Sequence, residues 1–152
     1  MPNFLIRPIS PQDYGAWLPL WNGYNAFYGR LGPTALSSET TAATWARFFD
    51  PQEPVHALIA ESDGALVGLA HYLFHRSTIS IGPVCYLADV FTSESARGQG
   101  IATALIKEVY RHAMEASASR VYWQTHQTNL TAQGVYDKIA ERSGFIVYRH
   151  LL

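Results

Sequence analysis

The spacing of apolar residues changes several times along the chain, and each spacing predicts a type of element. Apolar positions three to four residues apart are typical of helices with one buried face. They predict helices over residues 11–28, 37–49, 101–114 and 129–140. Short apolar runs bounded by turn-forming residues are typical of strands. They predict strands over residues 4–7, 55–61, 66–74, 84–92, 120–125 and 145–152.

The order of these elements is β-α-α-β-β-β-α-β-α-β. The Asp63-Gly64 pair between the second and third strands favours a tight hairpin turn, because both residues accept positive φ angles. A hairpin meander therefore sits between α/β units, so the sheet must be mixed. The expected fold class is α/β (more strictly α+β), with a mixed, mostly antiparallel sheet flanked by helices.

Composition and charge exclude several classes of protein. The 152 residues are 48% hydrophobic and 15% charged, which fits a single domain over residues 1–152. A net charge of -1 provides no field that favours nucleic acid. Cys85 is the only cysteine, so an intramolecular disulfide and a Cys-rich zinc site are ruled out, and no histidine pair has the spacing of metal ligands.

No apolar run approaches the ~18–20 residues of a membrane span, and the start has no signal pattern, so we expect a soluble, cytoplasmic protein without metal or membrane partner.

The strongest chemical signal follows the strand at residues 84–92. A short loop leads from it into the run Arg-Gly-Gln-Gly at residues 97–100, at a helix start. Glycines let the backbone approach a ligand closely, and the free N–H groups of a helix start attract anions. The pattern favours a cradle for a diphosphate, although such a turn can also be only a tight loop. A dinucleotide-binding fingerprint fits poorly because it needs a third small residue where Thr103 stands, and a P-loop is excluded because no Gly-Lys-Ser/Thr follows.

The same run carries a family resemblance. Residues 97–102, Arg-Gly-Gln-Gly-Ile-Ala, match the Arg/Gln-x-x-Gly-x-Gly/Ala signature of the GNAT superfamily, the acyl-CoA-dependent N-acetyltransferases. Asn129 and Tyr136 stand where that family has an Asn and a Tyr in the helix after its fifth main strand, and residues 144–145 begin its last strands. The chain thus resembles a GNAT domain over residues 4–152. The resemblance implies a sheet splayed between strands 4 and 5, and acetyl-CoA as cofactor.

A narrower likeness concerns residues 86–92, Tyr-Leu-Ala-Asp-Val-Phe-Thr. This run is similar to one in the diamine and polyamine acetyltransferases and their histone/polyamine-acetylating relatives, as are residues 71–78 and 122–125. That branch usually has Glu where this chain has Ala88, and the carboxylate helps to gather a cationic amine. Ala88 therefore argues against polyamine substrates.

The resemblance assigns cofactor binding to the fourth strand and the loop after it. The strand backbone would hold the pantetheine arm as an added strand, and the loop would hold the diphosphate. Asn129 would bind a cofactor amide or a bridging water, or would cap its helix, while Lys138 would meet the 3′-phosphate or stay solvated. The implied cofactor-binding residues are Val90, Phe91, Thr92, Arg97, Gly98, Gln99, Gly100, Ile101, Ala102, Thr103, Asn129 and Lys138.

Two residues are implied as catalytic. Tyr136 would be the general acid that protonates the leaving CoA thiolate, although its place on the apolar stripe of its helix also fits a core tyrosine. Asp89 would take the proton from the substrate ammonium, directly or through water, or would bond only to nearby backbone. His71 and His126 are weaker candidates for this base.

Aromatic residues make up 13% of the chain, and several lie on the first helix. In the family the first two helices cover the acceptor groove. Trp21, Tyr24 and Tyr28 would line that groove and hold an ammonium by cation–π contact, or would pack on the sheet, as we expect for Trp17.

The resemblance implies an acetyl-CoA-dependent N-acetyltransferase that transfers the acetyl group directly to a primary amine of a small molecule or peptide. The alternatives are a non-catalytic acyl-CoA-binding or regulatory module and a protein lysine or N-terminal acetyltransferase. The apolar end Leu151-Leu152 suits contact with a second copy, so a homodimer is one option. The sequence leaves the acceptor and the oligomeric state open.

Overall fold

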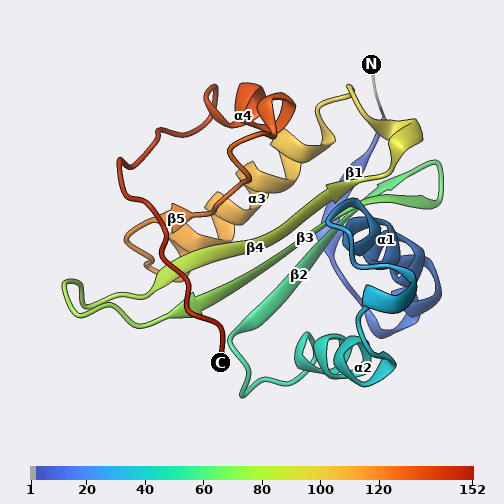
Figure 1. Cartoon of the computed structure of the whole chain (residues 1–152), viewed down its shortest axis with the longest axis horizontal. Coiled ribbons are helices and arrows are strands. Elements are labelled where there is room, and N and C mark those ends of the chain that lie inside the picture. The colour runs from blue at the N-terminus through green and yellow to red at the C-terminus, as the bar shows by residue number, and fades with distance from the viewer. Residues whose placement is uncertain (1–2) are drawn as a thin grey trace.

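The computed structural model describes residues 3–152 and contains one five-stranded sheet (Figure 1). The strands lie side by side in chain order. The first four are antiparallel to their neighbours, whereas β4 and β5 are parallel. The bounds are β1 Leu5–Pro8, β2 Val55–Ser62, β3 Ala65–His75, β4 Val84–Thr92 and β5 Val121–Tyr122. The mixed, mostly antiparallel sheet that the sequence predicts is confirmed.

Four α-helices cover the two faces of the sheet. α1 and α2 lie on one face, and α3 and α4 lie on the other (Figure 1). Within residues 3–152, no helix combines the length and apolar character needed to cross a bilayer. The bounds are α1 Tyr14–Phe27, α2 Ser38–Arg47, α3 Ile101–Glu115 and α4 Leu130–Tyr136, with 3-10 turns at Pro11–Asp13, Gly32–Thr34 and Glu94–Ala96.

Each face of the sheet has its own buried cluster, because successive side chains of a strand point to opposite faces. On one face, Trp17 of α1 packs with Leu69 of β3, and Trp17 is fully buried, as expected. On the other face, Ala70 belongs to the cluster beneath α3. α3 lies so close to the sheet that a Cβ at Gly68 would come within 3.0 Å of Ile101. The two layers therefore hold β3 and β4 rigidly between them.

The sheet opens between β4 and β5. The two strands pair at only two positions, Cys85 with Val121 and Tyr86 with Tyr122. In the part of the chain that the structure describes, residues 87–92 of β4 have no strand partner on that side. This is the splay that the family resemblance implies, and it exposes a strand edge to which an extended ligand can bond.

The C-terminal part departs from the prediction. β5 ends at Tyr122 rather than residue 125, and α4 ends at Tyr136 rather than residue 140. The predicted strand over 145–152 is wrong: this segment forms no strand, and Phe145 is 90% exposed. Apolar, β-forming residues make a strand only where a neighbour offers backbone partners, and the two-residue β5 offers too few.

Candidate active site

The loop after β4 has the backbone shape that its glycines permit. Gly98 and Gly100 have φ angles of 77° and 81°, which L side chains rarely adopt. A Cβ at either position would meet no other atom within 4 Å. The glycines therefore serve the turn itself, and the space next to the loop can accept a ligand.

The loop leads into the N-terminus of α3, which has no side-chain cap. The bond from Ala104 N to Gly100 O, 3.0 Å long, opens the helix. The N–H groups before Ala104, including that of Thr103, have no partner within the helix and carry the positive end of its dipole. Arg97 adds a cation beside them, held by a 3.2 Å bond from its Nε to Thr92 O. The arrangement suits a diphosphate.

Two buried hydroxyls flank the opening between β4 and β5. Among residues 3–152, Thr92 Oγ1 at the end of β4 and Thr125 Oγ1 just after β5 are buried without a hydrogen-bond partner. Leaving a buried polar group unpaired is costly, so both hydroxyls suit bonding to a ligand's amides. Together with the loop, they fit the pantetheine arm and diphosphate of acetyl-CoA. The sequence prediction missed Thr125, whose only signal is its place at the end of a predicted strand.

Tyr136, the last residue of α4, packs against the cluster beneath α3. Its ring packs edge-on against Trp123, with 5.4 Å between centroids. Burial, together with nearby Tyr28, raises the pKa of the Tyr136 phenol above its usual range. Tyr136 therefore keeps its proton at neutral pH, as a general acid must.

The remaining two residues that the resemblance assigns to the cofactor lie on or next to α4. Asn129 is its N-cap, and Asn129 Oδ1 accepts from Ala132 N at 3.2 Å. This leaves the amide nitrogen of Asn129 available to a ligand. Lys138 lies just beyond the helix and is exposed.

A β-bulge in β4 turns Asp89 toward the α1 face. His71 pairs with Asp89, but the next residue of β3, Tyr72, pairs with Leu87, so Ala88 is an extra residue. Leu87 belongs to the cluster beneath α3, whereas Asp89 bonds to His71 beneath α1. Residues i and i+2 of a regular strand share a face, so only the bulge allows these two to differ.

A buried chain of hydrogen bonds holds Asp89 in place. Trp17 Nε1 donates to His71 Nε2 at 3.1 Å, and His71 Nδ1 lies 2.9 Å from Asp89 Oδ2. An indole N–H can only donate, so His71 Nε2 accepts and its proton is on Nδ1, which donates to the carboxylate. His71 is 2% exposed, and the Asp89 side chain is 19% exposed. His71, with its proton on Nδ1, therefore holds the Asp89 side chain at the edge of the solvent.

Asp89 lines a cleft of about 190 Å³ between the helices α1 and α2 and the sheet. Trp21 of α1 and Phe48, which follows α2, also line it, as do Ala88 and Arg47. The cleft brings together Trp21 and Asp89, two of the predicted site residues. The sequence prediction missed Arg47 and Phe48, because nothing in their local pattern separates them from other helix-end residues.

Tyr24 and Tyr28 lie beside Asp89 but do not line this cleft. Burial, with the Asp89 carboxylate as a second cause, raises the pKa of both phenols. The Arg30 guanidinium stands 5.6 and 5.5 Å from the centroids of the two rings. Arg30 therefore already supplies the cation–π contact that the sequence suggested for a substrate ammonium.

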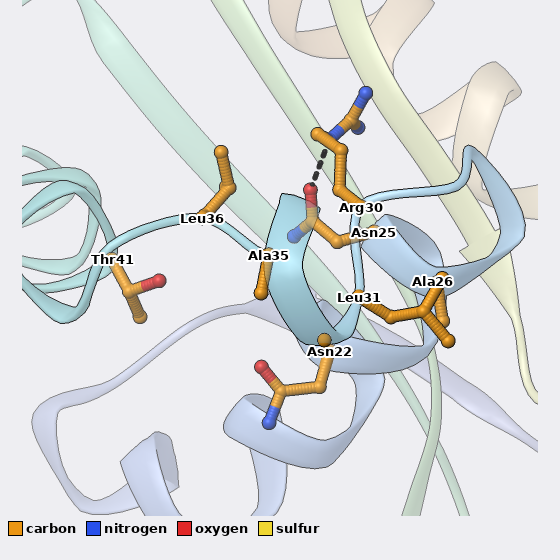
Figure 2. A pocket seen from close by; sticks show the side chains of 9 residues that line it. Asn22, Asn25, Ala26, Arg30, Leu31, Ala35, Leu36 and Thr41 are labelled. Atoms are coloured by element: carbon orange, nitrogen blue, oxygen red, sulfur yellow. Dashed lines mark hydrogen bonds between the residues drawn. The ribbon is translucent and has the colours of Figure 1, made fainter.

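A larger hollow of about 320 Å³ lies between α1, the segment that follows it and the first turn of α2 (Figure 2). In it, Arg30 Nε donates to Asn25 Oδ1 at 2.7 Å (Figure 2). Neither Asp89 nor Tyr136 lines this hollow. Of these two hollows, the smaller cleft has Asp89 in its lining, and we name it the acceptor cleft after the role that we propose for it.

His126, a weaker candidate for the base, and the lone cysteine both lie apart from these groups. His126 is exposed, and its Nδ1 lies 2.7 Å from Thr128 Oγ1 rather than near Asp89. Cys85 is buried, and burial raises the pKa of its thiol to about 12. Cys85 is therefore an inert thiol.

Known proteins are similar to this chain in sequence and in fold. Residues 17–140 match the model of the Acetyltransferase (GNAT) family. The D-amino-acid N-acetyltransferase HPA3 of Saccharomyces cerevisiae is 33% identical over 149 residues, covering 97% of this chain and 90% of that protein. The thialysine N-epsilon-acetyltransferase of Sus scrofa is 29% identical over 150 residues, covering 93% and 86%. The structure of the aminoglycoside N-acetyltransferase AAC(6')-Iy in complex with CoA superposes with a TM-score of 0.78 at 19% identity, covering 98% of this chain and 95% of that one. The chain therefore belongs to the GNAT family and is an acetyl-CoA-dependent N-acetyltransferase.

Proposed function

We propose that this chain transfers the acetyl group of acetyl-CoA directly to the primary amine of a small molecule, with a free amino acid as the first candidate. The observation that carries the proposal is the layout of β4. Asp89, in the acceptor cleft, and Thr92, at the opening toward β5, stand three residues apart on this strand, about 10 Å along it. One strand therefore joins a binding place for an amine to a binding place for the cofactor.

The cofactor would lie in the opening between β4 and β5. Bound acetyl-CoA supplies the activated acetyl thioester. Val90, Phe91 and Thr92 would offer backbone groups to its pantetheine arm, and residues 97–103 would hold its diphosphate with their N–H groups and the Arg97 guanidinium. Asn129 and Lys138 complete the set that the resemblance implies.

Asp89 would act as the base for the acceptor. An ammonium has no free electron pair, so it must lose a proton before its nitrogen can form the new C–N bond. The Asp89 carboxylate accepts this proton and returns it to the solvent, because part of its side chain is exposed. His71 orients the carboxylate, since its Nδ1–H donates to Oδ2.

Tyr136 would act as the general acid. Its phenol donates a proton to the sulfur as the C–S bond breaks, and it recovers a proton from the solvent. The raised pKa of Tyr136 supports this role, because the proton is present at every pH near neutrality.

The charges in the acceptor cleft favour an amine with one positive charge. Ala88 lines the cleft at the position where the polyamine-acetylating branch usually has Glu, so Asp89 is the one carboxylate in its lining. The names of two relatives, the D-amino-acid and the thialysine acetyltransferases, specify small amines as their substrates. We therefore propose a likeness to the small-amine members of that branch rather than to polyamine acetyltransferases.

The test is a thiol-release assay with purified protein, acetyl-CoA and a panel of amino acids, diamines and lysine peptides. The proposal expects CoA release that depends on a small amine and a matching N-acetylated product by mass spectrometry. Acetyl-CoA binding without release for any acceptor would instead favour a non-catalytic module. Release with peptides alone would favour a protein acetyltransferase.

Two expectations about assembly stay predictions. We propose that residues 1–152 act as one domain and that two copies associate through the exposed apolar end, where Leu151 is 74% exposed. Light scattering of the full chain, compared with a Leu151→Ser/Leu152→Ser variant, measures this. A wild-type chain that is monomeric at assay concentrations would contradict the homodimer.

A further inference from the structure

The acceptor cleft carries one positive and one negative side chain. Asp89 and Arg47 both line it, and no other Asp, Glu, Lys or Arg does so. They come from different elements, since Asp89 belongs to β4 and Arg47 is the last residue of α2. An occupant that matched both would be a zwitterion.

Arg47 is not used elsewhere in the described structure. Within residues 3–152, its guanidinium makes no ion pair and no side-chain hydrogen bond, whereas Arg7, Arg111 and Arg142 each pair with a carboxylate. Its position in the last turn of α2 also complements that helix dipole, but this needs no particular direction of the side chain. A guanidinium presents a planar fork that matches a carboxylate, so a ligand carboxylate is its natural partner.

Asp89 is not that partner: among residues 3–152, no ion pair or hydrogen bond joins it to Arg47. Its Oδ2 lies 2.9 Å from His71 Nδ1, and His71 is locked from behind by Trp17. The two opposite charges are therefore both available to one bound molecule. The remaining lining includes the rings of Trp21 and Phe48, which suit an apolar side chain.

The size of the cleft restricts the occupant further. Its volume of about 190 Å³ is below the range of about 300–1,000 Å³ that is typical for drug-sized ligands. A single amino acid fits this scale better than a peptide or a long polyamine.

We propose that Arg47 is a specificity-determining residue that binds the carboxylate of a free amino-acid acceptor, while Asp89 receives its ammonium. This inference rests on the proposed acetyl transfer to small amines and adds the group that selects among them. The two contacts fix both ends of the acceptor backbone and direct the nitrogen toward β4. The acceptor side chain then lies against Trp21 and Phe48.

The test compares three acceptors that differ only at the carboxylate: phenylalanine, phenylalaninamide and phenethylamine, with both enantiomers of the first two. Wild-type kcat/KM is expected to be highest for the free amino acid. Arg47→Gln should lower kcat/KM for phenylalanine by about 10- to 100-fold, mainly through KM, and change that for phenylalaninamide by less than about threefold. Arg47→Lys should restore part of the preference, because it keeps the charge but loses the fork.

The matched control is Arg149→Gln, which removes an exposed arginine far along the chain and should leave all three values unchanged. An equal fall for phenylalanine and its amide in Arg47→Gln, or no fall for either, would overturn the inference. Wild-type acetylation of all three acceptors without any preference would overturn it too, while the proposed function would stand. Absence of CoA release with every acceptor would instead remove the proposed function, and this inference with it.

Discussion

The two sides of the site are built in different ways. The cofactor side, from β4 to the start of α3, consists mainly of backbone: two glycines with positive φ, uncapped helix N–H groups and an unpaired strand edge. The acceptor side consists of side chains, with Asp89, His71, Trp17 and Arg47 drawn from four separate elements. The cofactor side depends on a particular backbone conformation, whereas the acceptor side depends on side chains from several elements lying close together.

This difference predicts that the two sides fail independently. A change of backbone shape should abolish cofactor binding without touching the acceptor cleft. A change of side chain in the cleft should alter turnover while the cofactor still binds.

Gly100→Asp should abolish acetyl-CoA binding, because it adds a carboxylate where the loop would hold a diphosphate. Calorimetric titration should show no binding. Gly144→Asp is the matched control, since Gly144 has a φ of 83° against 81° for Gly100 and equally open space. It carries the same backbone strain away from the loop and should bind normally. Loss of binding in both variants would show that strain alone is responsible.

Tyr136→Phe should lower kcat by about 10²–10⁴-fold and leave acetyl-CoA affinity near wild type, because it removes a proton donor and little volume. Since burial raises the pKa of the Tyr136 phenol, the wild-type kcat should not fall on this account below about pH 10. Tyr110→Phe is the control: Tyr110 Oη donates to Ile139 O at 3.0 Å, so its loss should affect stability and not kcat. Equal kcat for Tyr136→Phe and wild type would remove Tyr136 from the chemistry.

Trp17→Phe should change the pH profile rather than the maximal rate. Without the indole N–H, His71 Nε2 can take a second proton. The resulting imidazolium forms an ion pair with Asp89 and so competes with the acceptor ammonium for this carboxylate. Asp89 is bonded to His71, Arg47 lines the same cleft, and no second carboxylate is in the lining that the described residues form. We expect kcat/KM for the amine to fall relative to wild type as the pH is lowered, because acid favours this second proton. Trp45→Phe removes an equal volume from the same aromatic cluster and should show the wild-type profile; a matching shift in both would refute the role of the N–H.

Asp13 belongs to neither the cofactor side nor the acceptor side, so Asp13→Asn should reduce stability without changing turnover. Two 2.9 Å bonds join Asp13 to Arg7, which lowers the pKa of Asp13 to about 2. A carboxylate with a lowered folded-state pKa stabilises the fold above its unfolded pKa, and this contribution disappears as the pH falls from about 4 to about 2. We expect a loss of about 1–2 kcal/mol of unfolding free energy at pH 7 and almost none at pH 2, with kcat unchanged. Urea titrations at both pH values measure this, and a loss of the same size at both would contradict the ion-pair explanation.

The backbone shape of the loop after β4 can be predicted from the sequence for a physical reason. A backbone cradle needs glycine at fixed spacing next to a helix start, and such a requirement is visible in a local run such as residues 97–102. The same holds for the sheet up to β4, whose strands carry clear apolar runs and a hairpin turn at Asp63-Gly64.

The structures of the acceptor side and of the C-terminal segment cannot be predicted in the same way from local sequence patterns. The bulge at Ala88 decides which face Asp89 occupies, yet no residue type in that run requires a bulge. Arg47 and Phe48 reach the cleft only through the packing of α2 beside α1. Residues 145–152 have the composition of a strand, but whether they pair depends on the length of β5, which is a property of the fold and not of the segment.

The separation of the two sides is tested most directly by Asp89→Asn, which keeps the size of the side chain and an oxygen that can accept from His71 Nδ1–H. Acetyl-CoA affinity and the rate of CoA release with a small amine are measured in the same preparation. For Asp89→Asn, we expect a dissociation constant for acetyl-CoA within about twofold of wild type and a fall in kcat/KM for the amine of about 10²-fold or more. Unchanged turnover, or a loss of cofactor binding as large as the loss of turnover, would contradict it.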